Sequence, residues 1–108
     1  MHFVSWNVNG IRAIIKKEFV ANVRTMAPDI MGLQETKAAQ DEVLSALEVL
    51  PEYTVYANSS KARKGYSGTA ILTKFEPLDV TYDMGLDDHD QEGRVIAAEY
   101  PTYFFVTV

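Results

Sequence analysis

One short stretch constrains the fold more than any other: the apolar run Ile30–Leu33, which becomes polar with no turn residue in between. Residues 34–37 follow it directly and supply an amide, a carboxylate, a hydroxyl and an ammonium group. An apolar run of this length suits a buried strand, and open α/β sheets bind ligands just beyond the carboxyl ends of such strands. Glu35 is then a carboxylate at the rim of a core, able to hold a hard cation through oxygen. A solvated turn after an ordinary strand is the alternative interpretation.

The residues before this strand predict a strand–helix–strand unit. Phe3–Val8 nearly alternates β-branched or aromatic residues with polar ones, as strands do. From Ile11, apolar residues recur at 11, 14, 15, 19, 20, 23 and 26, which is helical spacing, and a proline ends the pattern. A unit of this kind has parallel strands and a right-handed crossover. Asn7 and Glu35 are therefore expected at the same edge of one sheet, which a solvated turn does not predict.

Further along the chain the pattern predicts a second helix and several more strands. The expected elements are a helix over Ala39–Leu50 and strands over Tyr53–Ala57, Thr69–Thr73, Leu78–Tyr82, Arg94–Glu99 and Thr102–Val108. The connection 58–68 is long for a hairpin and is the most basic part of the chain, with Tyr66 and Ser67 between two glycines. Glycines permit close backbone approach, lysines bind phosphates, and aromatic rings pack on sugars or bases. The connection is either a nucleic-acid-binding loop or a mobile solvated one.

The net charge of −5 does not decide the partner, because the charge is unevenly distributed. Five acidic residues lie within one acidic stretch: Asp83, Asp87, Asp88, Asp90 and Glu92. The rest of the chain holds the other ten acidic residues against ten basic ones and is neutral. Phosphate affinity depends on local basic patches, so nucleic acid remains a possible partner. The acidic stretch must form a surface loop, since so many carboxylates cannot be buried unpaired, and its spacing matches no standard metal-binding loop.

Length and composition exclude several classes of protein. A chain of 108 residues is one domain at most. No run of about 18 apolar residues predicts a membrane span, and the N-terminus lacks the charged and apolar regions of a secretion signal. The absence of cysteine excludes disulfides and cysteine-ligated zinc or iron–sulfur sites. We therefore expect a soluble intracellular protein, cytoplasmic in a bacterium or archaeon and nuclear in a eukaryote.

Four motifs, in order, resemble the exonuclease III family of apurinic/apyrimidinic endonucleases, within the endonuclease/exonuclease/phosphatase superfamily. They are Ser5–Ala13 (SWNVNGIRA), Leu33–Lys37 (LQETK), Lys64–Gly68 (KGYSG) and Asp90–Ile96 (DQEGRVI). The last two are similar to the branch that includes the major human enzyme. Because the motifs cover nearly the whole chain, the resemblance is specific. It implies an α/β fold that is half of a four-layer α/β/β/α sandwich (DNase I-like), to which this chain contributes one mixed sheet with two outer helices.

The resemblance also implies a function and a set of site residues. Members of the family are DNA-repair phosphodiesterases that use Mg²⁺ or Mn²⁺ to cut duplex DNA on the 5′ side of abasic sites, and many also have 3′–5′ exonuclease activity. By position, the resemblance implies that Asn7 and Glu35 are catalytic and that both contribute to the metal site, with Glu35 as the carboxylate ligand. Asn9 is a weaker metal ligand because some relatives have aspartate there. The implied DNA-binding residues are Arg12, Ala13, Lys17, Lys37, Gly65, Tyr66, Ser67 and Arg94.

Part of the family's catalytic apparatus has no counterpart in this sequence. A later tyrosine, a Gly-Asp-x-Asn motif and an Asp-His pair complete the site in the family, and neither His2 nor His89 matches the catalytic histidine. The chain also stops within an apolar strand, 103–108, without a cap or polar tail. We therefore expect residues 1–108 to be the N-terminal part of one truncated domain, inactive without the second half as its partner. A non-catalytic DNA-binding module and another metal-dependent phosphodiesterase of the superfamily are the alternatives.

Overall fold

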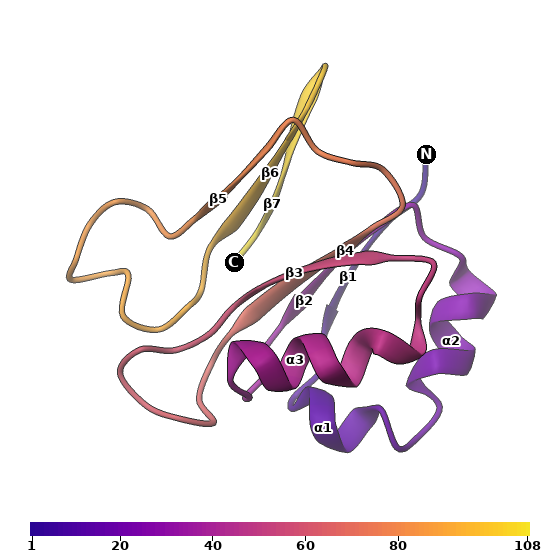
Figure 1. Cartoon of the computed structure of the whole chain (residues 1–108), viewed down its shortest axis with the longest axis horizontal. Helices are drawn as coiled ribbons and strands as arrows, with labels where there is room; N and C mark the ends of the chain where they lie inside the picture. The colour runs from indigo at the N-terminus through magenta and orange to yellow at the C-terminus, as the bar shows by residue number, and fades with distance from the viewer.

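Two β-sheets and a layer of helices make up the structure, a computed structural model that describes residues 1–108 (Figure 1). The first sheet has strand order β1-β2-β4-β3 and contains β1 (Phe3–Asn7), β2 (Ile30–Gln34), β3 (Thr54–Asn58) and β4 (Thr69–Thr73). The second has order β5-β6-β7 and contains β5 (Asp79–Tyr82), β6 (Ile96–Tyr100) and β7 (Tyr103–Thr107). β1 and β2 are parallel and every other pair is antiparallel, so the first sheet is mixed, as predicted.

The helices cover one face of the first sheet and the second sheet lies on the other (Figure 1). They are α1 (Ile11–Ile14), α2 (Phe19–Met26) and α3 (Gln40–Ala46), and a 3₁₀ turn over Leu47–Val49 follows α3. None of the helices has the length and apolar character that crossing a bilayer requires.

The central strand β2 is buried on both faces, and this explains its continuous apolar sequence. Because side chains alternate along a strand, Met31 and Leu33 join the core beneath the helices, whereas Ile30 joins the core between the sheets. The first core has 14 buried residues and the second has five. Most of the apolar burial therefore lies between the first sheet and the helices.

Two sequence expectations need correction. The helical stripe from Ile11 to Met26 is not one helix, because a turn over residues 15–18 separates α1 from α2. The apolar spacing continues through both helices, so the break is set by tertiary contacts. α1 packs on α3, whereas Phe19 of α2 is fully buried, with its ring centroid 5.1 Å from that of Trp6.

The second correction is that the chain contributes strands to two sheets rather than one, since β5, β6 and β7 pair only with one another. The α/β class itself is confirmed.

The two sheets meet closely at the glycine in the middle of β2. A Cβ atom at Gly32 would lie 3.1 Å from the Thr107 side chain and 3.2 Å from that of Phe105, so glycine allows this approach. The Gln34 amide donates hydrogen bonds to Ser5 Oγ at 3.0 Å and to Thr107 Oγ1 at 2.9 Å. Thr107 therefore couples the end of β7 to the strand that carries the candidate site.

Candidate active site

The parallel pairing of β1 and β2 brings their carboxyl ends together. Asn7 lies opposite Gln34 in the register, and the pairing continues past both strands, because Gly10 donates its backbone N–H to the Glu35 carbonyl at 2.8 Å. Asn7 and Glu35 line one cavity of about 270 Å³. The prediction that they share one edge of the sheet is confirmed.

This cavity is polar and contains one acidic and one basic side chain. Its lining residues are Asn7, Gln34, Glu35, Ser67, Gly68, Thr69, Arg94 and Val108. The Arg94 guanidinium donates to Glu92 Oε1 at 2.8 Å and to the Tyr66 hydroxyl at 3.2 Å. The hydrogen bond to Glu92 raises the pKa of Arg94 further, so the guanidinium stays charged. The cavity therefore offers a carboxylate to a cation and a fixed positive charge to an anion such as phosphate.

The backbone around the cavity is unusual. Six residues other than glycine have positive φ, and four of them gather at this edge of the first sheet: Asn9 (48°), Glu35 (57°), Lys37 (53°) and Ser67 (53°). Each such residue costs roughly 1–3 kcal/mol, and strained positions of this kind cluster at functional sites. A hydrogen bond of 2.7 Å from the Lys37 N–H to the Ser67 carbonyl helps to hold two of them. The strain marks this edge of the sheet as a candidate functional region.

Glycine is required where the basic connection rejoins the sheet. Gly68 has a φ of +92°, and a Cβ atom there would lie 2.3 Å from Thr36 Oγ1, which is itself buried without a hydrogen-bond partner. Any side chain at position 68 would therefore push the connection away from the strand end that carries Glu35.

The oxygen donors at the cavity suit a hard cation that keeps part of its water shell. Glu35 supplies a carboxylate and Asn7 an amide oxygen, which is oriented by a 3.0 Å hydrogen bond from the Asn9 N–H. No group of three or more His, Cys, Asp or Glu residues in the chain could hold a metal. Mg²⁺ is commonly bound through one or two carboxylates plus waters and substrate phosphates, so the donor set fits partial coordination of that ion.

Asn9 lies apart from this donor set. It does not line the cavity, and its Oδ1 accepts a hydrogen bond from the Lys37 ammonium at 2.6 Å. A side-chain oxygen already bonded to a cationic group is poorly placed to bind a metal directly. The structure therefore brings Glu35 and Asn7 together but gives Asn9 a different partner.

A second, open depression of about 540 Å³ lies beside the site and is basic. It is lined by Gly10, Arg12, Ala13, Lys16, Lys37 and Gly65, with no acidic residue. We call it the basic groove. Four residues predicted to bind DNA meet here, although they come from three separate motifs of the sequence. Lys17 does not line the groove, and Lys16, which the sequence analysis missed, takes that place. Both lysines lie in the turn between α1 and α2.

Neighbouring residues hold the Arg12 side chain over the groove. Its guanidinium donates to Glu42 Oε2 at 3.2 Å and to the Lys37 carbonyl at 3.2 Å. The Ala39 N–H also donates to the Glu42 carboxylate, and this bond, together with Arg12, lowers the pKa of Glu42. Arg12 is therefore oriented by α3 while its side chain remains 56% exposed.

Tyr66 and Ser67 do not line the groove. The Tyr66 ring lies 4.6 Å from the Arg63 guanidinium carbon and 5.7 Å from that of Arg94, both within the range of cation–π attraction. Ser67 is buried and lines the cavity of Glu35. The tyrosine therefore links the basic connection to Arg94 instead of presenting a free stacking face.

Solved structures of nucleases share this architecture. The 3′–5′ exonuclease NExo from Neisseria meningitidis, also solved as a 3′ phosphatase bound to a product DNA hairpin, matches with a TM-score of 0.79 and 30% identity. The match covers 98% of this chain and 40% of that chain. The chain thus forms part of a DNase I-like α/β fold.

Sequence comparison assigns the family. The Endonuclease/Exonuclease/phosphatase family model matches residues 4–108, and the chain belongs to this family. It is 49% identical over 108 residues to the DNA repair nuclease APEX1 of Danio rerio, covering 99% of this chain and 35% of the relative. It is 46% identical over 110 residues to the exodeoxyribonuclease of Bacillus subtilis, covering 100% of this chain and 42% of the relative. The chain therefore spans well under half the length of these relatives.

Proposed function

We propose that this chain supplies the metal-binding carboxylate and part of the DNA-binding surface of a Mg²⁺-dependent DNA-repair phosphodiesterase. Its reaction is cleavage of duplex DNA on the 5′ side of an abasic site, with 3′–5′ exonuclease activity as a second reaction. One observation carries the proposal: Glu35 and Asn7 converge on a small polar cavity at the same sheet edge as the basic groove. The nuclease names of the similar proteins support it.

Each residue of the cavity has a role in this proposal. Glu35 and Asn7 would hold Mg²⁺ or Mn²⁺, and the bound ion supplies Lewis-acid stabilisation of charge on the phosphodiester oxygens. Asn9 would act indirectly, by orienting Asn7 through its N–H and Lys37 through its side chain. The Arg94 guanidinium would attract a phosphate oxygen to the same cavity.

The basic groove would hold the duplex through its phosphates. Arg12, Lys16 and Lys37 supply three cations around one depression, and Gly10 and Gly65 leave room for the nucleic-acid backbone. Because contacts of this kind carry no base specificity, recognition of the lesion would depend on the geometry of the site.

We further propose that the 108 residues bind DNA but cannot cleave it alone. Phosphodiester hydrolysis needs a group that activates water, and no histidine lines either the cavity or the groove. His2 precedes β1 at the end opposite Asn7, and His89 lies in the loop between β5 and β6. Residues beyond this chain would then have to supply the missing group.

The test is incision of a duplex that carries one abasic-site analogue, with Mg²⁺ and with chelator. The 108-residue chain is compared with a fusion in which the remaining residues of the Bacillus subtilis exodeoxyribonuclease follow it. We expect cleavage only by the fusion, abolished by chelator and reduced roughly 100-fold or more by Glu35→Ala.

Two other outcomes would change the proposal. If neither protein cleaves but both bind duplex DNA, the chain is a binding module rather than a nuclease part. If the short chain cleaves at the rate of the fusion, a residue within the 108 activates the water.

A further inference from the structure

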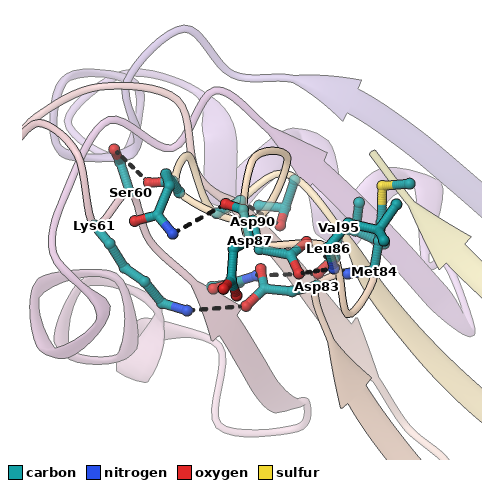
Figure 2. Close-up of polar contacts among 12 residues, drawn as sticks. Ser60, Lys61, Asp83, Met84, Leu86, Asp87, Asp90 and Val95 are labelled. Carbon is teal, nitrogen blue, oxygen red and sulfur yellow. Dashed lines mark hydrogen bonds and ion pairs between the residues drawn. The ribbon is translucent and has the colours of Figure 1, made fainter.

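Two loops that differ sharply in charge lie against one another at one end of the sheets (Figures 1 and 2). We call residues 59–68, between β3 and β4, the basic loop, and residues 83–95, between β5 and β6, the acidic loop. A set of acidic residues beside a DNA-facing surface lowers affinity through repulsion of phosphates. The contacts between the loops indicate how the acidic loop can nevertheless aid DNA binding.

Asp90 is the residue that organises the acidic loop. It is only 8% exposed, whereas the neighbouring Asp87 and Asp88 are exposed. Its Oδ1 accepts the backbone N–H of Met84 and its Oδ2 that of Leu86, both at 2.7 Å (Figure 2). Both carboxylate oxygens therefore hold the loop backbone, which a carboxylate does better than a neutral group.

The residue after Asp90, Gln91, holds the basic loop through its backbone carbonyl. The Gln91 carbonyl accepts the backbone N–H groups of Lys61 at 2.7 Å and Ala62 at 2.9 Å. These are the only backbone–backbone hydrogen bonds that residues 60–64 make outside their own segment. The end of the basic loop is also held by the segment after β2, through the hydrogen bond from the Lys37 N–H to the Ser67 carbonyl, but its middle, residues 60–64, depends on where the acidic loop places the Gln91 carbonyl.

Further contacts keep the two loops at this close distance. The Lys61 ammonium lies 3.1 Å from Asp83 Oδ2, and Asn58 donates to Asp83 Oδ1 at 2.8 Å. Gly93 packs directly on the basic loop, because a Cβ atom there would lie 2.3 Å from the Ser59 carbonyl carbon. The basic loop then continues to Gly65, which lines the basic groove.

We propose that Asp90 is a positioning residue for DNA binding: by fixing the acidic loop, it places the Gln91 carbonyl that holds the basic loop at the edge of the basic groove. The proposal rests on the function proposed above and adds a role for a residue that does not touch the groove. It predicts that the acidic loop aids DNA binding through its shape although its charge opposes it.

Two matched variants separate shape from charge. Asp90→Asn and Asp88→Asn each remove one negative charge from the same loop, but only the first places an NH₂ donor where a backbone N–H needs an acceptor. In fluorescence anisotropy with a labelled duplex, we expect Asp90→Asn to bind about tenfold more weakly than wild type. Asp88→Asn should bind as tightly as wild type or slightly more tightly, because it removes a repelling charge without a contact.

Amide hydrogen exchange gives a readout that needs no DNA. Exchange of the Lys61 and Ala62 amides should become faster in Asp90→Asn and stay unchanged in Asp88→Asn, while the Leu33 amide in β2 stays protected in both. If wild type fails to bind DNA, the proposed function fails, and exchange still decides whether Asp90 positions the loop. Unchanged exchange at Lys61 and Ala62 in a folded Asp90→Asn variant would overturn the inference, as would an affinity equal to that of Asp88→Asn.

A second variant covers the case in which Asp90→Asn does not fold. Asp90→Glu keeps the charge but moves the carboxylate one methylene away from the two N–H groups. Weaker DNA binding and faster exchange at Lys61 and Ala62 would support the positioning role. Wild-type behaviour in both measurements would contradict it.

Discussion

The two sheets of this molecule are buried to different extents. The first sheet has helices on one face and the second sheet on the other, and the 14-residue core lies between this sheet and the helices. The second sheet is covered on one face only, and on its other face Phe104 is 66% and Val106 53% exposed. Glu35 directly follows the buried strand β2, and Asn7 ends the neighbouring edge strand β1, so β2 gives the site a rigid support. The second sheet supplies contacts that hold this support in place.

The largest expected effect tests whether stability really resides in the first sheet. Leu72→Ala deletes a fully buried side chain from β4, and Leu78→Ala makes the same deletion at a site that is 66% exposed before β5. We expect a loss of unfolding free energy of about 2–5 kcal/mol for the first variant. For the second we expect about 0.5 kcal/mol or less in urea denaturation. Equal losses would show that burial in the first sheet does not set the cost of the deletion.

The next effect tests the contact between the sheets. Gly32→Val places side-chain atoms where Thr107 and Phe105 already lie, and such overpacking should cost about 1–3 kcal/mol of unfolding free energy. Combining it with Thr107→Gly opens space and should recover part of the loss in a double-mutant cycle. Strictly additive losses would mean that the close approach is not the cause.

A smaller effect concerns the hydroxyl of Tyr100, which joins the sheets. It donates to Thr73 Oγ1 at 2.8 Å, so Tyr100→Phe should cost about 0.5–1.5 kcal/mol at pH 7.

The same tyrosine predicts a pH dependence. Burial raises the pKa of Tyr100, so the folded state holds the proton at pH values where the unfolded chain, with a pKa of about 10, has lost it. The contribution of the Tyr100 hydroxyl to the free energy of unfolding is therefore fully present below about pH 10. It is lost as the pH rises through the pKa of the folded state. Urea midpoints measured at alkaline pH should fall less steeply in Tyr100→Phe than in wild type. Parallel curves would contradict this.

The smallest effect concerns charge on the helical side of the first sheet. Glu42→Gln removes the ion pair with Arg12, whereas glutamine can still accept the Ala39 N–H. We expect stability close to wild type and roughly twofold tighter binding to duplex DNA, because Arg12 is released to the phosphates. Weaker binding would show that Glu42 is needed to orient Arg12.

The sequence was sufficient to predict the arrangement that matters most for the site. The alternating strand pattern over Phe3–Val8 and the apolar run Ile30–Leu33, with a helical stripe and Pro28 between them, allow essentially one local arrangement. The side chains that directly follow each strand must then meet. This logic placed Asn7 beside Glu35 without any tertiary information.

Two features of the fold could not be predicted because local patterns do not encode them. The turn between α1 and α2 leaves the apolar spacing intact, so only packing against α3 and Trp6 reveals it. Strands β5–β7 were expected as strands, but alternation along a strand does not tell which sheet it joins. Both features are set by contacts distant in sequence.

In the candidate site, too, some residues could be predicted from sequence motifs, whereas contacts between residues distant in sequence could not. Arg12, Ala13, Lys37 and Gly65, four of the residues predicted to bind DNA, line one groove. Lys16 rather than Lys17 joins them. The bond from Lys37 to Asn9 lies between two motifs, and neither motif alone reveals it.

Each sheet is drawn from one uninterrupted stretch of the chain, residues 3–73 for the first and 79–107 for the second. On the ribosome, every strand of the first sheet is therefore made before any strand of the second. At bacterial or eukaryotic synthesis rates, the remaining 35 residues, 74–108, follow over roughly 2–7 s. During that interval the face that carries Ile30, Gly32 and Gln34 has no covering sheet. A nascent chain is therefore most exposed to chaperones and aggregation in these few seconds.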